Sequence, residues 1–130
     1  MLTFQCFKMV RSREKEWLMH QGVHAQTHPI PAGEKEGFLK RKLIEESQEV
    51  STSETHVHAL SELIDVQEAV WALLHHWGIS KEGWETLCQE KREARGQYSD
   101  GVLLTRLDLP ASHSKALHYQ SQSERYFPVL

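Results

Sequence analysis

Hydrophobic positions in the middle of the chain repeat with the period of an α-helix. Between Glu34 and Val50, apolar side chains at Leu39, Leu43 and Val50 are four and then seven residues apart, so they fall on one stripe of a helix. The spacing predicts a helix over residues 34–50. We expect this stripe to face the core, because burying an apolar stripe is what holds such a helix in place.

A second helix is predicted after a short Ser/Thr-rich break. Ser51-x-x-Glu54 has the form of a capping box, and the helix is expected to run to about Trp77, where Gly78 ends it. Its apolar face consists of five side chains: Leu63, Val66, Val70, Leu73 and Trp77. Because the break is short, the two helices are expected to pack as an antiparallel hairpin.

Shorter elements are predicted on both sides of this hairpin. One helix is expected between Ser12, as its cap, and Gly22, and another between Ser80, as its cap, and Gly96. The stretch between the first of these helices and the hairpin contains two prolines and a glycine and is predicted to be a linker. The fold class is therefore predicted as all-α, a helical bundle built on a long central antiparallel hairpin.

Composition limits the function classes. The 130 residues fit one domain over 1–110, followed by a polar, loosely held tail over 111–130. A formal net charge of −3 does not favour binding to nucleic acid or to a membrane surface. The two cysteines, Cys6 and Cys88, do not have a disulfide or metal spacing, and no leader or membrane-spanning run is recognisable. A cytoplasmic location is expected.

Two acidic pairs lie on the helices of the predicted hairpin. Each pair is spaced three residues apart: Glu46 with Glu49, and Glu62 with Asp65. Like charges at this spacing share a helix face and repel each other. Glu46 also occupies the place between Leu43 and Val50 in the apolar stripe, where a carboxylate is costly unless it is paired or binds a metal.

The hairpin register brings the two acidic pairs together. Facing positions of an antiparallel hairpin have numbers with a constant sum, and Glu46 with Asp65 and Glu49 with Glu62 both add to 111. The four carboxylates should therefore meet across a gap of about 8–10 Å between the helix axes. An all-oxygen site of this kind suits Mg²⁺, with Mn²⁺ as a possible substitute, and does not indicate zinc.

Basic residues near the end of the last predicted helix have two interpretations. Lys91 and Arg95 are four residues apart, and either they stabilise the helix C-terminus or they bind phosphate oxygens. His56 and His58 lie in the first turn of the second hairpin helix, where a surface position is expected. The tryptophans are expected in the core or in a subunit interface.

The motifs EESQE at 45–49 and ELID at 62–65 resemble the signature of the all-α nucleoside triphosphate pyrophosphohydrolase superfamily. These are the MazG-like and phosphoribosyl-ATP pyrophosphohydrolase-like proteins. The flanking sequences are similar too, and KMVRSREKE at 8–16 is similar to the K-x-V-R-D-K opening of one branch. Ser12 stands where that branch usually has aspartate. The resemblance covers about residues 8–104.

This resemblance implies hydrolysis of a nucleotide between its α- and β-phosphates, with Mg²⁺ as cofactor. It implies Glu46, Glu49, Glu62 and Asp65 as the metal ligands and places Glu45 behind them, and Glu49 is the candidate base. It also implies a homodimer or homotetramer. A house-cleaning nucleoside triphosphate pyrophosphohydrolase is the leading prediction. The alternatives are the phosphoribosyl-ATP step of histidine biosynthesis and a non-catalytic helical interaction module that retains the site.

Overall fold

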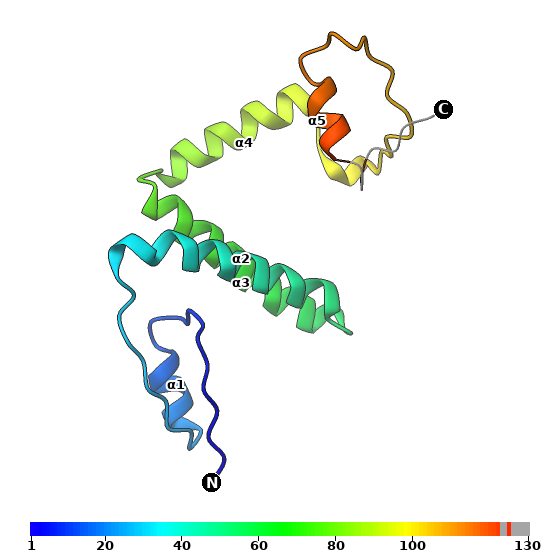
Figure 1. Ribbon diagram of the computed structural model, residues 1–130. Helices are drawn as coiled ribbons and strands as arrows, with labels where there is room; N and C mark the ends of the chain where they lie inside the picture. Colours follow the sequence, from blue (N-terminus) through cyan, green and yellow to red (C-terminus); the bar gives the residue numbers. More distant parts are fainter. Residues whose placement is uncertain (123–124, 126–130) are drawn as a thin grey trace. The chain divides into compact units, whose positions relative to one another are not determined.

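The structure is a computed structural model, and it describes residues 1–122 and 125. The described residues form five α-helices and two short 3-10 helices, with no strand among them, which confirms the all-α prediction (Figure 1). The α-helices are α1 (Glu14–His20), α2 (Lys35–Thr52), α3 (His56–His76), α4 (Lys81–Arg95) and α5 (Ala116–Ser121), and the 3-10 helices are η1 (Ala32–Glu34) and η2 (Tyr98–Asp100).

The chain divides into two compact units, Met1–Lys91 and Arg92–Leu130. The division falls inside α4, whereas the sequence suggested a boundary between 110 and 111, which stays a prediction. Within the expected tail, residues Ala116–Ser121 are helical. The prediction of a loosely held tail over 123–124 and 126–130 lies outside the described residues. No helix of the described residues has both the length and the apolar character that a membrane crossing requires.

Helices α2 and α3 pack side by side as the predicted antiparallel hairpin of the first unit (Figure 1). The buried hydrophobic side chains among the described residues all come from these two helices: Leu39, Ala69, Leu73 and Leu74. Full burial of a leucine contributes about 1.5–3 kcal/mol. At the open end of the hairpin, the indole N–H of Trp77 donates to the Glu36 carboxylate. The hairpin therefore combines a small apolar core with a polar contact at its end.

The turn between α2 and α3 corrects the predicted capping box. Ser51 lies in the last turn of α2, where its hydroxyl donates to the Gln48 carbonyl at 2.9 Å, so it does not begin a new helix. The cap of α3 is Thr55, whose backbone is extended and whose hydroxyl accepts from the His58 amide at 3.1 Å. The prediction for Ser51 and Glu54 was wrong, because α2 continues through Ser51 to Thr52 and the hydroxyl that caps α3 is that of Thr55.

The other predicted helix ends are partly confirmed. Ser12 does not cap α1, because the N-cap position is Arg13 and no side chain makes a capping bond there. The first amide of α1, from Glu14, donates instead to the Arg11 carbonyl at 3.1 Å. Ser80 caps α4 as predicted, accepting from the Gly83 amide at 3.0 Å. Gly22, the predicted stop of α1, has a φ of 76°, which favours glycine.

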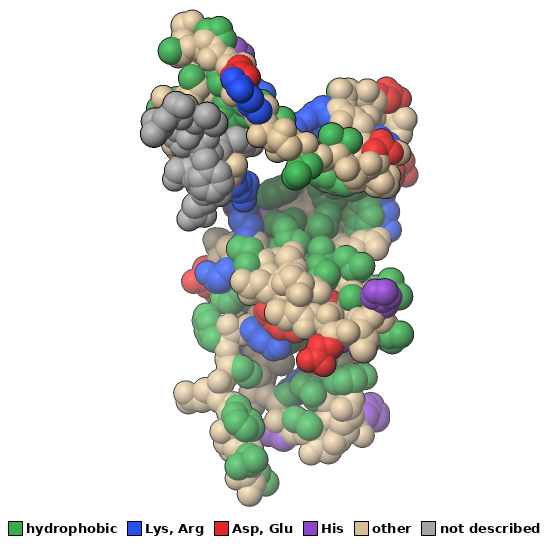
Figure 2. Space-filling model, turned by 90° about the vertical axis from the view of Figure 1, so that its right-hand side faces the viewer, with side chains coloured by type: hydrophobic (Ala, Val, Ile, Leu, Met, Phe, Trp, Pro, Cys, Tyr) green, Lys and Arg blue, Asp and Glu red, His purple; other side chains and the backbone are tan. Residues whose placement is uncertain are grey.

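The apolar face predicted for α3 is only partly covered. Leu73 is buried and Val66 is half-buried, but Leu63 is 48% exposed, so its predicted burial was wrong. Trp77 is 49% exposed and lies outside the core, and its alternative place in a subunit interface stays a prediction. Helix α3 faces α2 through Ala69 and Leu73, and Leu63 lies outside that stripe. Further large hydrophobic side chains of the hairpin are exposed as well: Ile44, Val57, Leu60 and Ile64. Exposed hydrophobic side chains are also visible on the face shown in Figure 2.

Candidate metal centre

Three carboxylates meet where α2 and α3 face each other. Glu46 comes from α2, while Glu62 and Asp65 come from α3, and one oxygen of each lies within 4.8 Å of the others. Glu46 is only 6% exposed, so the prediction that it lies in the core-facing stripe is confirmed. Side chains on two facing helices can approach in this way because residues three apart share a helix face.

The helical period explains why Glu46 is buried. It follows Leu39 and Leu43 along the stripe that faces α3, at intervals of four and three residues. The packing of the hairpin then brings it close to Asp65 and Glu62 of α3, and its hydrogen-bonding contact is with Glu62. The predicted pairing of Glu46 with Asp65 and of Glu49 with Glu62 stays a prediction. Packing of the hairpin therefore forces a carboxylate into the interface between the helices.

Glu49 and Glu45 lie beside this cluster. Glu49 lines the same depression, but it is exposed and its carboxylate does not belong to the group of three. Glu45 is half-buried, lines the same depression and contacts two lysines, and its place behind the metal ligands stays a prediction. The roles of Glu49 as ligand and base stay predictions.

The cluster opens into a depression of about 340 Å³. Six carboxylate side chains and three basic side chains line it, which leaves three negative charges uncompensated. The acidic residues are Glu14, Glu45, Glu46, Glu49, Glu62 and Asp65, and the basic residues are Lys8, Arg11 and Lys42. Such an excess of negative charge in a concave surface attracts cations.

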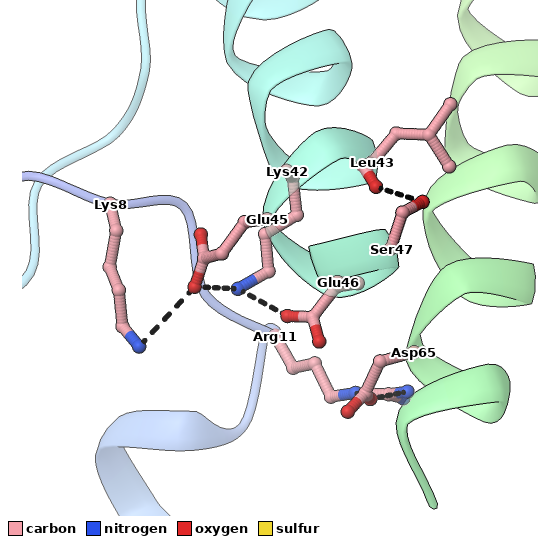
Figure 3. Close-up of polar contacts among 8 residues, drawn as sticks. All are labelled: Lys8, Arg11, Lys42, Leu43, Glu45, Glu46, Ser47 and Asp65. Atoms are coloured by element: carbon pink, nitrogen blue, oxygen red, sulfur yellow. Dashed lines mark hydrogen bonds and ion pairs between the residues drawn. The ribbon is translucent and has the colours of Figure 1, made fainter. Parts of the chain in front are cut away.

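Lys42 bridges two of the carboxylates (Figure 3). Its ammonium group lies 2.8 Å from Glu46 Oε1 and 3.3 Å from Glu45 Oε1. Burial lowers the pKa of Lys42, but the contacts with Glu46 and Glu45 outweigh this effect and raise the pKa above its usual value. Lys42 therefore stays charged and partly offsets the cost of the buried Glu46.

Two further basic residues reach the site from the N-terminal segment, one at the clustered Asp65 and the other at Glu45. Arg11 donates to Asp65 Oδ1 through Nη2 at 2.6 Å and through Nε at 3.1 Å, and this contact raises the pKa of Arg11. Lys8 Nζ lies 3.7 Å from Glu45 Oε1 (Figure 3). Sequence reasoning assigned no role to these residues. The available signal was their place in KMVRSREKE, the stretch that carries part of the resemblance.

Glu62 differs from the other two clustered carboxylates, because among the contacts described it is paired with a histidine and with neither a lysine nor an arginine. His58 Nε2 lies 3.0 Å from Glu62 Oε1. Hydrogen bonding with Glu46, followed by burial and the negative charge of Glu46, raises the pKa of Glu62, although the contact with His58 acts in the opposite direction. When both are ionised, Glu46 and Glu62 repel each other, and a proton on Glu62 converts that repulsion into a hydrogen bond. His58, which was expected at the surface, is exposed as predicted and also touches this site.

The structure does not test the two residues that were predicted to bind phosphate. Lys91 and Arg95 are exposed. Lys91 is absent from the lining of the depression, as far as the described residues define it, and Arg95 belongs to the second compact unit. Their phosphate contacts stay predictions. Cys6 and Cys88 are free thiols, as the sequence indicated.

The donor set fits a hard divalent cation. It consists of carboxylate oxygens only, one of them on a buried residue, and the surrounding charge is negative after the basic residues are counted. Neither imidazole nor thiolate belongs to the group of three, so the site does not favour zinc. Comparison of the chain with protein-family models, with curated proteins and with solved structures gives no match.

Proposed function

We propose that this protein is a magnesium-dependent nucleotide pyrophosphohydrolase that cleaves a nucleoside triphosphate into a monophosphate and pyrophosphate. One observation carries the proposal: Glu46, a buried carboxylate in an apolar stripe, meets Glu62 and Asp65 of the facing helix within 4.8 Å. Burial of a carboxylate beside two others is unfavourable without a cation. The choice of reaction comes from the resemblance of EESQE and ELID to a pyrophosphohydrolase signature.

Magnesium would be held by Glu46, Glu62 and Asp65, with Glu49 as a further ligand, and Mn²⁺ could replace it. Bound there, the ion would supply charge neutralisation for the phosphates and a lowered pKa for the attacking water. The three clustered residues fix its place because two rigid helices carry them. Glu45 lies behind them and orients Lys42 through their 3.3 Å contact.

The remaining residues act on the water and on the phosphates. Glu49 is exposed on the rim of the depression, where it can accept the proton of the attacking water while the bond between phosphorus and the bridging oxygen breaks. Counter-charge for phosphate oxygens is available from Lys8 and Lys42 in the depression. From the sequence we also propose that Lys91 and Arg95 bind phosphate.

The exposed apolar surface supports self-assembly as part of the proposal. Only four hydrophobic side chains of the described residues are buried, which is a small core for a chain of this size. The exposed stripe of α3, with Val57, Leu60 and Ile64, would be covered in a homodimer or homotetramer. The MazG-like bundle would then be completed between subunits.

One observation favours a second candidate function. Arg11 and Lys42 already pair with Asp65 and Glu46, so the cluster could serve only as an ion-pair network in a helical interaction module. In that case no divalent cation is needed. The charge excess of the depression argues for a bound cation, because three negative charges remain after all basic residues are counted. Turnover then separates an enzyme from a module that retains a metal site.

A substrate screen decides between these functions. Nucleoside triphosphates and phosphoribosyl-ATP are incubated with the protein and Mg²⁺, and monophosphate and pyrophosphate are quantified with and without chelator. We expect turnover of at least one triphosphate that disappears with chelator and in Glu46→Gln. Release of orthophosphate with a diphosphate would contradict cleavage between the α- and β-phosphates. Turnover of phosphoribosyl-ATP alone would assign the histidine-pathway step.

A further inference from the structure

Arg11 is attached to the site through a single oxygen. Its Nε and Nη2 both donate to Oδ1 of Asp65, at 3.1 and 2.6 Å. A guanidinium that binds a carboxylate side-on uses two oxygens, and that arrangement is the stronger one. About half of the Arg11 side chain is exposed, and it lies on a stretch without helix or strand, before α1. The contact therefore uses one carboxylate oxygen and is accessible to solvent, which leaves it open to exchange.

Lys42 provides a contrast within the same site. It belongs to α2, its side chain is 18% exposed, and its two acidic partners are three and four residues away on the same helix. The helix backbone fixes that arrangement. Arg11, in contrast, meets Asp65 across 54 residues of sequence. Of these two cations, Arg11 is the one that can change partners while the hairpin stays intact.

The position of Arg11 conflicts with a cation at the clustered carboxylates. Its guanidinium occupies an oxygen of Asp65 and also feels the negative charges of Glu68 and Glu46. A divalent cation bound to the cluster would compete for Asp65 and would repel the guanidinium. A displaced Arg11 remains at the edge of the depression, where an anion that accompanies the cation would attract it.

We propose that Arg11 exchanges partners: it holds Asp65 in the metal-free protein and contacts a phosphate oxygen of the substrate once Asp65 is engaged in metal ligation. This inference rests on the proposed function and adds to it a residue whose partner depends on whether cation and nucleotide are bound. Arg11 would limit cation binding in the absence of a nucleotide and would favour the joint arrival of cation and phosphate. The planar, multiply donating guanidinium suits both partners.

Calorimetric titration of Arg11→Met tests the exchange without any turnover. Titrated with Mg²⁺ alone, the variant should bind about two- to fivefold more tightly than the wild type, which is the equivalent of one exposed ion pair. Titrated with inorganic pyrophosphate in saturating Mg²⁺, it should bind about tenfold more weakly or worse, as expected for the loss of hydrogen bonds to a charged group. The two affinities should therefore change in opposite directions.

Matched variants define the controls. Arg13→Met removes an exposed charge two residues away that does not line the depression, and it should leave both titrations unchanged. Arg11→Lys keeps the charge and should retain the wild-type affinity for Mg²⁺ with partial loss of pyrophosphate affinity. Circular dichroism verifies that each variant is folded, and Arg11→Gln, which also removes the positive charge, carries the test if Arg11→Met is not folded.

The outcomes distinguish a failure of the exchange from a failure of the proposed function. Weaker Mg²⁺ binding in Arg11→Met would mean that Arg11 only supports the site, and unchanged pyrophosphate affinity would mean that it does not contact phosphate; either result overturns the exchange. The proposed function survives both results if Glu46→Gln abolishes Mg²⁺ binding. Absence of Mg²⁺ binding by the wild type would overturn the proposed function. Without a bound cation Asp65 stays paired with Arg11, so that result would overturn the exchange as well.

Discussion

The ammonium group of Lys42 lies 2.8 Å from Glu46 Oε1, and the two side chains are only 18% and 8% exposed. This pair is shielded from solvent far more than the Lys40–Glu36 pair of the same helix, in which the side chains are 55% and 44% exposed. Both pairs have a spacing of four residues. Because it is buried, the Lys42–Glu46 pair should matter more for the stability of the hairpin than the exposed Lys40–Glu36 pair.

Replacement of Lys42 by methionine should destabilise the metal-free protein by about 2–3 kcal/mol, because Glu46 would stay buried without its cation. Urea unfolding in chelator measures the change. The matched variant Lys40→Met should cost less than about 1 kcal/mol. The double variant Lys42→Met/Glu46→Gln should recover most of the loss. Equal effects of Lys42→Met and Lys40→Met would show that burial does not strengthen the Lys42 pair.

The corrected cap of α3 can be tested separately from the site. Thr55→Ala removes the hydroxyl that accepts from the His58 amide, and it should lower the free energy of unfolding by about 1 kcal/mol. Ser51→Ala should have a smaller effect, below about 0.5 kcal/mol, because the Ser51 hydroxyl bonds only to a carbonyl of its own helix. The opposite order in thermal unfolding would restore the predicted capping box.

Local and periodic features of the fold were predictable from sequence. The range of α4 was predicted as observed, and α2 and α3 differ from the prediction by one or two residues at most of their ends. The burial of Glu46 followed from its spacing to Leu43, because the helical period determines which side chains share a face. Where two hydroxyl residues competed for one cap, sequence could not decide, since either Ser51 or Thr55 can bond to the backbone nearby.

The basic partners of the site were only partly predictable from the sequence. Lys42 is four residues from Glu46, so this pair could have been predicted from helix spacing. The Arg11–Asp65 contact spans 54 residues and starts from a stretch without regular structure, so no period relates the two positions. Leu63 was misassigned for a related reason. Its spacing fits an apolar face, but which face of α3 packs against α2 depends on the whole hairpin.

Stability should depend on pH through Glu62. Its pKa is raised in the folded state, so its contribution to stability is complete below the ordinary value near 4.5 and is lost as pH rises through the raised pKa. Metal-free wild type should therefore lose stability relative to Glu62→Gln as pH rises from about 4.5 towards neutrality. Unfolding of both proteins across this range gives the difference. Glu54→Gln, at an exposed carboxylate of the turn, is the control and should follow the wild type.

The two interpretations of Lys91 and Arg95 predict different measurements. If they bind phosphate, Lys91→Ala or Arg95→Ala should raise KM by a factor that corresponds to about 1.5–3 kcal/mol. If they only stabilise the end of α4, KM should hardly change, and the free energy of unfolding should fall by a few tenths of a kcal/mol. Both side chains are exposed, so neither substitution should disturb the core.

Glu46 and Glu49 should respond differently to neutralisation, because one is buried in the cluster and the other is exposed beside it. Glu46→Gln should abolish both the thermal stabilisation by Mg²⁺ and the turnover. Glu49→Gln should keep most of the stabilisation by Mg²⁺ and lose about 10²–10⁴-fold in kcat, as expected when a general base is removed. Thermal shift and kinetic assays at the same Mg²⁺ concentration compare the two. A loss of Mg²⁺ stabilisation as complete as in Glu46→Gln would make Glu49 a principal ligand instead of a further one, and the proton acceptor would then have to be another residue of the depression.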